Sequence, residues 1–416
     1  MKDTTLGTGA YKGVRDFYPK DMYVERYMFD TMSRAAESFG YSEYGASVLE
    51  PVELYKSKSS EEIVSEQTYT FTDRGGREVT LRPEMTPTVA RMVAAREREL
   101  TFPLRWYTIA NMFRYERPQR GRMREHWQLN ADIFGVPDIE AEVEIIALSS
   151  SIMKAFGAHE SDFEIRVSDR SILFSLFDEL ALSQETQKQL LLLLDKKDRA
   201  PHSDIELEKL LGDKTSAFRE KIKRASSSTE LELLIKRLKG VGVTNAIVDT
   251  SIVRAFNYYT GIVFEVFDTS GENKRSLFGG GRYDNLLELF GKKKIPAVGF
   301  GMGDITLRDF LETHELLPEY VPRTDLYLCT LSEKARGYAQ ALAQELRAQD
   351  INVEVSLSVK RVGDQVAVAS AKSIPFVICI GEDEMKSKEF TIKELKGGKE
   401  KVLLKETIAD YIFSHI

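Results

Sequence analysis

Hydrophobic and polar positions alternate differently in the main body of the chain and in its last part. Residues 21–40 carry apolar side chains at helical spacing and end in Gly40, which is typical of an amphipathic helix with a glycine stop. Residues 105–116 and 126–135 have the composition of strands, and a polar loop over residues 117–125 separates them. Long strands, hairpins and flanking helices together predict an antiparallel α+β domain.

Turn-forming residues mark further elements of this domain. Residues 67–84 predict a hairpin with a turn at "RGG", and residues 86–101 predict a helix capped near Thr86. Two glycine-rich segments, residues 276–291 and 296–312, each predict a strand, a glycine turn and a helix. The first lacks the Lys-Ser/Thr pair of a phosphate loop, and the second lacks the βαβ surroundings of a dinucleotide site. We therefore interpret their glycines as tight turns or close helix contacts.

The pattern changes again in three places. Residues 172–240 are rich in Leu, Lys, Glu and Gln and predict a helical insertion. The α+β domain would then comprise residues 1–171 and 241–317. Residues 318–324 contain two prolines and read as a linker. Residues 325–416 alternate strands and helices, which predicts a small α/β domain on a largely parallel sheet.

Composition narrows the class of protein. The chain has 416 residues, 42% hydrophobic and 30% charged, as in a globular protein of two or three domains. Its two cysteines, Cys329 and Cys379, lie far apart in the sequence, which argues against a disulfide framework or a structural zinc site and fits a reducing compartment. The start of the chain lacks an apolar signal core, and no apolar run approaches the roughly 20 residues that span a bilayer. We expect a cytoplasmic protein without membrane segments.

A local cluster of positive charge contrasts with the formal net charge of −7. Residues 113–128 contain five arginines. Guanidinium groups bind phosphates and carboxylates through paired, charge-assisted hydrogen bonds, although a basic loop exposed to solvent is the alternative. We expect Arg114 and Glu116 to lie on one face of the first strand, two residues apart. Because a buried arginine needs a partner, that position favours an anion-binding site.

Two further segments leave alternatives open. In "RPEMTP", Glu84 and Thr86 stand at a helix start, where capping and the helix dipole are sufficient to explain both residues. In "RAFNYY", Arg254 stands beside Tyr258 and Tyr259. Aromatic packing in a core explains the two tyrosines but leaves the arginine unexplained.

Four segments, in this order and spacing, resemble the histidyl-tRNA synthetases, a family of class II aminoacyl-tRNA synthetases. "LRPEMTP" resembles the histidine-binding segment of the family, and "FRYERPQRGRMREHWQLNADIFG" resembles motif 2 of the class. "IVRAFNYYTGIVFE" and "FGGGRYDNLL" resemble two signatures of this synthetase. The resemblance runs from "GVRDFYP" near the start to "IPFVICIGEDE" near the end, and the combination of segments is far more specific than any single one.

The resemblance implies both a fold and a reaction. The fold would be a class II catalytic domain on an antiparallel sheet, with the helical insertion, followed by an α/β anticodon-binding domain over residues 325–416. In the reaction, the carboxylate of histidine attacks the α-phosphate of ATP and gives histidyl-adenylate and pyrophosphate. The adenylate then acylates the terminal ribose of tRNA(His). ATP is a substrate, Mg²⁺ is the expected metal ion, and no residue of the chain is expected to bind a metal directly.

The resemblance also implies roles around ATP and tRNA. Arg114 matches an arginine that contacts the α-phosphate, and Arg254 matches one that reaches this phosphate from the other side. These two would be the catalytic residues, because preorganised cations stabilise the charge that develops on the phosphate. Glu116 matches the acid that holds the adenine end of ATP. Arg117 and Gln119 match the loop that approaches the acceptor end of the tRNA.

Selecting histidine requires acceptors for imidazole N–H groups and a wall against larger rings. The resemblance places these residues around histidine: Glu84, Thr86, Arg122, Gln128, Asp132, Arg254, Tyr258, Tyr259 and Tyr283. Arg122 is also expected to contact ATP. Position 132 is Asp where many family members have Glu, so the acceptor is retained with a shorter reach.

Three positions depart from the family pattern. The family block usually reads Arg-Gly-Leu/Phe-Asp-Tyr-Tyr, whereas here Ala255 replaces the glycine and Asn257 replaces the aspartate. In "PAVGFGMGDITL", which aligns with motif 3, Thr306 stands where an arginine for the γ-phosphate is expected. Arg308 follows two residues later and, on a helix, would point about 200° away. The ATP site would then use another cation, such as Mg²⁺, or bind ATP more weakly.

The alternative to a ligase is a histidine-binding paralogue that regulates another enzyme without aminoacylation. Such paralogues typically lack the anticodon-binding domain, so residues 325–416 favour the ligase. "LEPVELY" resembles motif 1, which forms the dimer interface in this class, and we therefore expect a homodimer.

Overall fold

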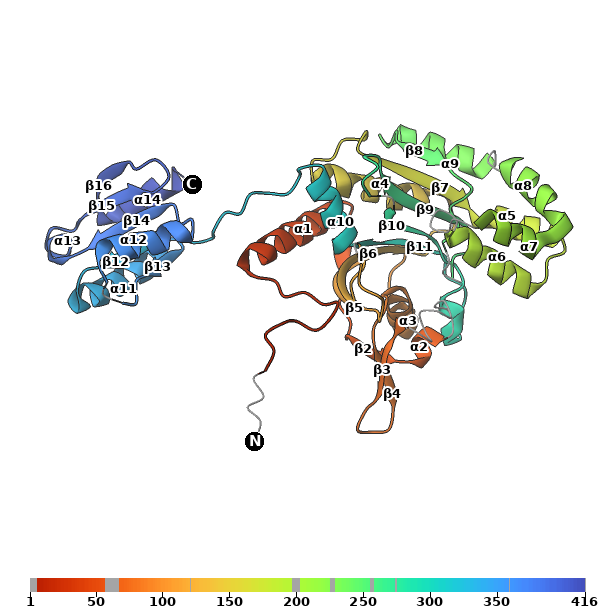
Figure 1. Cartoon of the computed structure of the whole chain (residues 1–416), viewed down its shortest axis with the longest axis horizontal. Coiled ribbons are helices and arrows are strands. Elements are labelled where there is room, and N and C mark those ends of the chain that lie inside the picture. The colour runs from red at the N-terminus through yellow and green to blue at the C-terminus, as the bar shows by residue number, and fades with distance from the viewer. Residues whose placement is uncertain are drawn as a thin grey trace. The chain divides into compact units, whose positions relative to one another are not determined.

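The structure, a computed structural model, describes residues 6–56, 67–119, 121–196, 203–224, 229–254, 258–273, 275–358 and 360–415. The chain forms two compact units, the first ending at Pro318 and the second beginning at Glu319 (Figure 1).

An eight-stranded sheet organises the first unit. In spatial order its strands are β1 (Ser42–Glu43), β5 (Leu104–Phe113), β6 (Glu125–Phe134), β11 (Ala297–Gly303), β10 (Ser276–Arg282), β9 (Ile262–Asp268), β7 (Phe163–Asp169) and β8 (Ala246–Val248). The strands from β5 to β7 pair antiparallel with their neighbours, while the short edge strands β1 and β8 pair in parallel. The predicted antiparallel α+β architecture is confirmed.

Helices cover one face of this sheet. They are α1 (Pro19–Ser38), α4 (Glu140–Ala155), α9 (Thr229–Gly240) and α10 (Asp304–Thr313) (Figure 1). The apolar side chains of α4 and the alternate residues Leu129, Ala131 and Ile133 of β6 are buried together in the main core. On the opposite face lie α3 (Thr86–Arg96), the short helix η5 (Leu287–Phe290) and a second core that contains several tyrosines. The two faces of β6 therefore differ, as the alternation of a strand requires.

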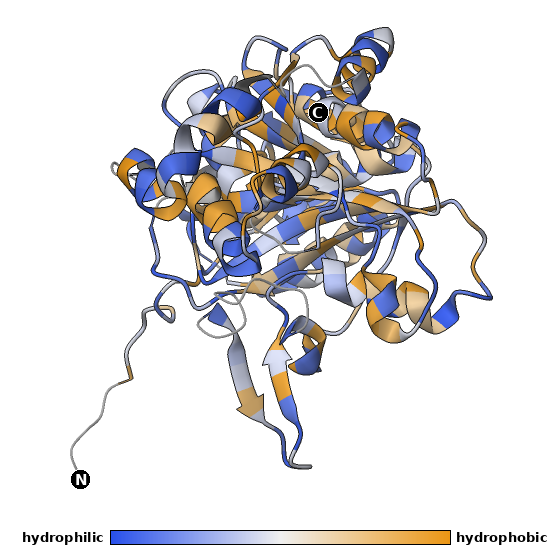
Figure 2. Cartoon of the chain, turned by 90° about the vertical axis from the view of Figure 1, so that its right-hand side faces the viewer, coloured by the Kyte–Doolittle hydropathy of each residue, from blue (hydrophilic) through white to orange (hydrophobic). Residues whose placement is uncertain are grey.

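A small sheet projects from the first unit (Figures 1 and 2). It contains, in order, β2 (Leu49–Pro51), β4 (Glu78–Leu81) and β3 (Tyr69–Thr72), and α2 (Glu53–Lys56) follows β2. The hairpin predicted over residues 67–84 is confirmed. Asp73 holds its turn by accepting hydrogen bonds from the backbone N–H groups of Gly75, at 2.8 Å, and Arg77, at 3.0 Å.

Two sequence-based expectations about strands are wrong. The turns expected at glycines 279–281 and at Gly299 and Gly301 do not form, because these glycines lie inside β10 and β11, whereas Gly291 ends the helix η5 with a φ of +66°. The strand expected over residues 105–116 ends at Phe113, so Arg114 and Glu116 lie beyond it. Both differences arise at the candidate active site.

Further helices form a separate core in the first unit. They are α5 (Arg170–Glu179), α6 (Gln184–Lys196), α7 (Ser203–Leu211), η3 (Gly212–Lys214) and α8 (Thr215–Arg224). Leu173, Phe177, Leu190 and Phe218 are among the buried residues of this core. These elements, with α9, occupy the segment predicted to be a helical insertion.

The second unit contains a five-stranded sheet. Its order is β13 (Val353–Val355), β12 (Leu326–Thr330), β14 (Phe376–Ile380), β15 (Glu389–Glu394) and β16 (Glu400–Leu404). The first three strands are parallel, as predicted, whereas β15 and β16 add an antiparallel hairpin that the pattern did not indicate. Helices α11 (Glu333–Arg347) and α12 (Val362–Ala371) pack in two different cores of this sheet. The short helices α13 (Glu382–Ser387) and α14 (Ile408–Phe413) complete the unit.

Candidate active site

The site begins with the polar residues of β6. Gln128, Asn130 and Asp132 alternate with the core residues of this strand and therefore project from the face opposite α4. Asp132 pairs directly with Gly299 of β11. A Cβ atom on Gly299 would lie 2.0 Å from Oδ1 of Asp132, whereas real Cβ contacts essentially never fall below 3.0 Å. The same Cβ would lie 2.8 Å from the backbone carbonyl oxygen of Ala131, so the position requires glycine while Asp132 occupies the space above it.

Two other strand glycines make room for predicted site residues in the same way. A Cβ on Gly301 would lie 1.7 Å from Nε2 of Gln128, and one on Gly279 would lie 2.1 Å from Nη1 of Arg254. Sequence reasoning missed this function because glycine normally weakens a strand and is read as a turn. A signal was nevertheless available in the sequence. Gly299 and Gly301 are two residues apart, which places both on one face of the strand.

Asp132 is buried and only half satisfied. The hydroxyl of Tyr283 donates a hydrogen bond to Oδ1, while Oδ2 has no hydrogen-bond partner among the described residues. Burial raises the pKa of Asp132 to about 7, although the hydrogen bond from Tyr283 acts in the opposite direction. A buried acceptor without a donor is costly, so this oxygen suits a ligand that brings its own N–H group.

Three tyrosines surround the site beside a second buried carboxylate. Tyr258 donates a hydrogen bond of 3.1 Å to Oε2 of Glu84. The ring centroids of Tyr258 and Tyr259 are 4.8 Å apart, and those of Tyr258 and Tyr283 are 5.9 Å apart. Thr86, the first residue of α3, interacts with Tyr258. The N-cap of α3 is Met85, so the expected capping role of Thr86 is wrong.

Arg254 lies over Gly279 in an unusual backbone conformation. Its φ is +49°, in the left-handed region that residues other than glycine seldom adopt. Nη1 of Arg254 is 3.3 Å from Oε1 of Glu265, and the guanidinium carbon is 5.5 Å from the ring centre of Tyr259. The carbonyl oxygen of Arg254 accepts a hydrogen bond of 3.1 Å from Arg170. These contacts hold the side chain on the site face. The departures at Ala255 and Asn257 lie outside the described residues.

A cleft of about 220 Å³ adjoins these groups. Among the residues that line it are Arg114, Glu116, Arg122, Gln128, Arg254 and Thr306. Arg114 donates from Nε to the carbonyl oxygen of Pro83 at 2.9 Å, and Arg122 forms an ion pair of 3.1 Å with Glu116. Three guanidinium groups thus face one small space.

The end of β5 explains why Arg114 and Glu116 are not on the strand. The backbone N–H of Arg114 still donates to the carbonyl of Arg124 at 2.8 Å, which adds one bond beyond the strand. The N–H of Glu116 then turns back to the carbonyl of Arg114 at 2.7 Å. This local turn ends the alternation, yet both side chains still line the cleft.

Part of the expected tRNA loop lines the cleft, through Gly121 and Arg122, whereas its two residues predicted to meet the tRNA do not. Gln119 and Arg122 exchange two backbone hydrogen bonds of 3.1 and 2.9 Å across a tight turn that includes Gly121. Arg117 and Gln119 are exposed and do not line the cleft. They are therefore separated from the other predicted site residues and face solvent.

Thr306 and Arg308 lie in different surroundings, as expected. Thr306 lines the cleft and donates a hydrogen bond of 2.6 Å to the carbonyl of Leu277. Arg308 forms ion pairs with Glu312, at 3.0 Å, and Asp21, at 3.8 Å, and does not line the cleft. It therefore does not take the place of the missing motif 3 arginine.

Sequence reasoning also missed two aromatic residues of the site. His126 lines the cleft, and burial, with the charges of Arg114 and Arg15, lowers its pKa to about 3. The Tyr44 ring centroid is 5.7 Å from that of Trp106, the residue paired with Asp132 on β5, and its buried hydroxyl has no hydrogen-bond partner among the described residues. His126 could have been predicted, because it alternates with the core residues of β6 as Gln128 does. Tyr44 could not, because it belongs to no recognisable motif.

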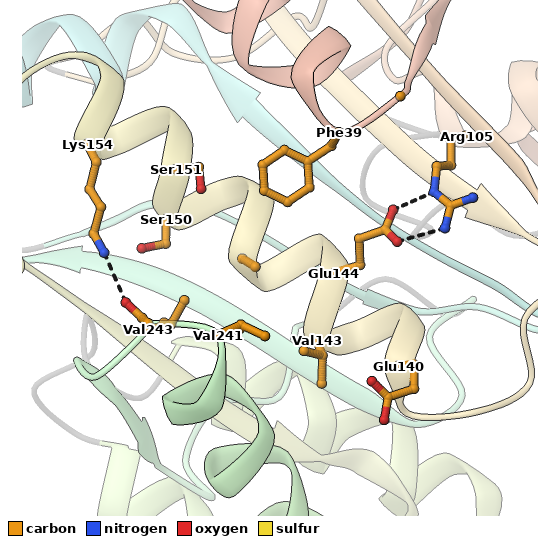
Figure 3. Close-up of a pocket in the computed structure, with 13 residues that line it drawn as sticks. Phe39, Arg105, Glu140, Val143, Glu144, Ser150, Ser151, Lys154, Val241 and Val243 are labelled. Carbon is orange, nitrogen blue, oxygen red and sulfur yellow. Dashed lines mark hydrogen bonds and ion pairs between the residues drawn. The ribbon is translucent and has the colours of Figure 1, made fainter.

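A larger pocket of about 620 Å³ lies on the other side of the unit, between α4, the end of α1 and the segment after α9 (Figure 3). Arg105 and Glu144 point toward each other there and form two bonds of 2.7 and 2.8 Å. Lys154 donates to the carbonyl of Gly242 at 3.1 Å. None of the predicted site residues lines this pocket. Its facing charges neutralise each other, unlike those of the cationic cleft.

The described residues contain neither a metal-binding cluster nor a membrane-spanning helix. Within those residues, no group of three or more His, Cys, Asp and Glu side chains could hold a metal ion. No helix in the described part of the chain is both long and apolar enough to cross a bilayer.

Comparisons with known proteins identify the family of the chain. The family described as Histidyl-tRNA synthetase matches residues 13–304, and the Anticodon binding domain family matches residues 325–413. A Histidine--tRNA ligase of Leptospira biflexa serovar Patoc is 42% identical over 415 residues, which cover 95% of each chain. These matches define an aminoacyl-tRNA synthetase with an appended anticodon-binding domain. The chain belongs to the histidyl-tRNA synthetase family.

Solved structures show the same fold. Histidyl-tRNA synthetase from Nostoc sp. PCC 7120 superposes with a TM-score of 0.81 at 23% identity, over 99% of this chain and 100% of its own. An ATP phosphoribosyltransferase regulatory subunit/histidyl-tRNA synthetase from Bacillus halodurans C superposes with a TM-score of 0.70 at 23% identity, over 88% of this chain and 97% of its own. At these identities, the likeness concerns the fold alone.

Proposed function

We propose that this protein ligates histidine to tRNA(His) through histidyl-adenylate, consuming ATP and releasing AMP and pyrophosphate. The observation that carries the proposal is the half-satisfied carboxylate of Asp132, buried among tyrosines beside a cationic cleft. Such an acceptor fits the N–H group of an imidazole, and the cleft fits a polyphosphate.

Histidine would occupy the space bordered by the three tyrosines. Oδ2 of Asp132 would accept the imidazole N–H, with Oδ1 held by Tyr283. Glu84, positioned by Tyr258, would bind the α-amino group together with Thr86. An analogue without a ring N–H leaves the buried Asp132 oxygen unpaired, which is the physical basis of selection. Tyr259 would form part of the wall around the ring, and Gln128 would complete the pocket.

ATP would bind in the cleft, with its α-phosphate between Arg114 and Arg254. A carboxylate oxygen of histidine attacks this phosphorus, and the bond to the pyrophosphate oxygen breaks. Because both cations are held before the reaction by Pro83 and Glu265, they stabilise the developing charge without reorganisation. Glu116 would hold the adenine end of ATP, and Arg122, paired with Glu116, would contact both substrates.

The second step needs the acceptor end of tRNA(His), whose ribose hydroxyl attacks the carbonyl carbon of the adenylate and releases AMP. The exposed Arg117 and Gln119 would meet this end from the loop whose Gly121 and Arg122 line the cleft. Residues 325–416 would bind the anticodon region, residues 318–324 would link the two units, and residues 172–240 would be an insertion in the catalytic domain.

Mg²⁺ would enter with ATP. The carboxylate that lines the cleft, Glu116, is already paired with Arg122. Mg²⁺ commonly keeps several waters and binds substrate phosphates with only one or two protein carboxylates. This donor set therefore fits an ion held mainly by phosphate oxygens, which would neutralise phosphate charge. We further propose a homodimer, on the motif 1 resemblance, and a cytoplasmic location.

Histidine-dependent exchange between ATP and pyrophosphate tests the proposal, with the other amino acids as controls. Exchange with histidine alone, followed by charging of tRNA(His), is the expected result. The observation that favours a histidine-binding regulator instead is Thr306, which leaves the cleft without the motif 3 cation. Histidine binding by calorimetry without exchange would support that regulator and contradict the ligase.

A further inference from the structure

The two cysteines of the chain meet in the second unit, although they are far apart in the sequence. Cys329 of β12 pairs directly with Cys379 of β14, and these strands are parallel. Paired residues of neighbouring strands project to the same face, so the two thiols lie side by side. Both face the small core that α12 covers. The distance in sequence argues against a disulfide framework or a zinc site, and both cysteines are free in the structure, but the sheet register makes them neighbours.

The spacing of the strands is compatible with a disulfide. Neighbouring strands lie about 4.8 Å apart. Disulfides join Cα atoms that are about 4.4–6.8 Å apart. Cys329 and Cys379, both free thiols in the structure, could therefore be joined without separating β12 from β14. The hydrogen-bonded ladder between the strands fixes the register that makes the two cysteines neighbours.

The two thiols differ in access and in acidity. Cys329 is fully buried, whereas Cys379 is partly exposed. Interaction with the Cys329 thiol lowers the pKa of Cys379, and Lys393 acts in the same direction, against burial and the nearby Glu384 and Glu400. The same contact, with burial, raises the pKa of Cys329 far above its usual range. Solvent reaches Cys379 and does not reach Cys329, so Cys379 is the reactive member and Cys329 is the resolving member.

We propose that Cys329 and Cys379 form an oxidisable dithiol whose substrates are hydroperoxides. The thiolate of Cys379 attacks one oxygen, the O–O bond breaks, and a sulfenic acid and a hydroxide or alkoxide form, the latter leaving as water or alcohol after protonation. The sulfur of Cys329 then attacks the sulfenic sulfur. An S–S bond forms, and the hydroxyl group leaves as water with the proton of Cys329. Two electrons pass from the dithiol to the hydroperoxide.

The position of the pair gives the disulfide a defined place in the unit. Each cysteine precedes the last residue of its strand, Thr330 in β12 and Ile380 in β14. The side-chain amide of Gln365, in α12, bonds both backbone groups of Thr330. It accepts from the N–H and donates to the carbonyl oxygen, each at 2.9 Å. This end of β12 is therefore fixed independently of the cysteines. We expect the unit to keep its fold in both oxidation states.

Counting thiols by mass tests the proposal and does not depend on the ligase activity. The reduced full-length protein is treated with hydrogen peroxide, unfolded and alkylated with iodoacetamide. Its mass is then measured by mass spectrometry. We expect both alkylation sites to be lost together, with the mass of two hydrogen atoms removed, and both to return after dithiothreitol. Retention of both thiols under peroxide that oxidises free cysteine would overturn the proposal, as would a disulfide that forms only between chains.

Single variants assign the two roles. In Cys329→Ser, we expect Cys379 to stop at the sulfenic acid, which dimedone traps. In Cys379→Ser, the remaining buried thiol should resist peroxide. A Cys379→Ser protein that reacts as fast as the wild type would contradict the assignment of Cys379. Circular dichroism checks that each variant is folded, and the wild-type mass measurement stands even if a variant is not.

Discussion

Gly299 of β11 lies directly opposite Asp132 of β6, and the carboxylate of Asp132 fills the space that any side chain at position 299 would need. A Cβ there would lie 2.0 Å from Oδ1 of Asp132 and 2.8 Å from the carbonyl oxygen of Ala131. The carbonyl belongs to the backbone of β6 and cannot swing aside. The glycine therefore sets the position of the buried acceptor.

Gly299→Ala should weaken histidine binding because the new methyl group displaces Asp132. Loss of a buried hydrogen bond to a charged group costs roughly 1.5–3 kcal/mol, which corresponds to about a 10- to 100-fold weaker affinity. Calorimetry with histidine measures this change. The control is Gly240→Ala, since a Cβ at the end of α9 meets nothing within 4 Å. Equal histidine affinity in the two variants would show that Asp132 does not bind histidine.

Asp132 should make the stability of the ligand-free protein depend on pH. Its pKa is raised from 3.8 to about 7, so between these values the folded state holds a proton that the unfolded state has lost. Stability from this group is complete below about pH 4 and is lost as the pH rises to about 7, by at most roughly 1.4 kcal/mol per pH unit.

Urea unfolding between pH 4 and pH 8 measures this slope in the wild type and in Asp132→Asn. The variant cannot titrate, so its stability should fall less over the interval. Glu25, whose pKa burial and the nearby Asp304 raise to about 8, contributes with the same sign and remains in both proteins. The difference between the two curves isolates Asp132. Parallel curves would show that its carboxyl is not perturbed.

Much of the fold followed from the pattern because it depends on alternation. In β6, apolar and polar positions alternate, and the structure places Leu129 in the core and Gln128 in the cleft. The parallel strands of the second unit also followed, since each is a short apolar run between helices. The hairpin of β15 and β16 was missed, although Phe390 and Ile392 of β15 alternate with polar residues and are buried, because β16 has a single buried residue, Leu403, among exposed ones.

The site was less accessible to sequence reasoning, for physical reasons. Gly299 and Gly301 look like turn residues because local propensity does not reveal that a neighbouring side chain needs their space. Glu116 leaves the strand because its backbone N–H donates a hydrogen bond to the carbonyl of Arg114. The residue types in this segment do not predict that bond. Tyr44 reaches the surroundings of Asp132 through long-range packing on Trp106.

Thr306→Arg should strengthen ATP binding. Thr306 lines the cleft, so an arginine there would bring the cation that motif 3 normally supplies. One charge-assisted contact contributes roughly 1.5–3 kcal/mol, and we expect the KM for ATP in the exchange reaction to fall by about tenfold or more. Arg308→Ala is the matched control, because Arg308 pairs with Glu312 and Asp21 away from the cleft. A fall in ATP affinity in that control would instead make Arg308 the γ-phosphate ligand.

Arg254→Ala should lower the rate of adenylate formation far more than the affinity for histidine. The charge of Arg254 matters most when negative charge develops on the α-phosphate, and loss of such a preorganised group costs roughly 10²–10³-fold in kcat. Glu265→Gln is the control, since it removes the ion pair of Arg254 and keeps the guanidinium. Pre-steady-state adenylate formation separates the two effects. A preserved rate constant with only a raised KM for histidine would show that Arg254 binds substrate and does not act on the phosphate.

Deletion of residues 319–416 should strongly reduce tRNA charging at low tRNA concentration and spare histidine activation. The first unit has its own cores on both faces of its sheet, and the second has separate cores around α11 and α12. All predicted residues for histidine and ATP belong to the first unit, so exchange between ATP and pyrophosphate should remain within a few-fold of the full chain. Loss of one of two linked binding modules weakens overall affinity by roughly 10²–10⁴-fold, and charging should fall by a comparable factor at low tRNA concentration. Circular dichroism establishes that the shortened chain is folded. A folded deletion protein that charges tRNA(His) as well as the full chain would show that the second unit does not bind the tRNA.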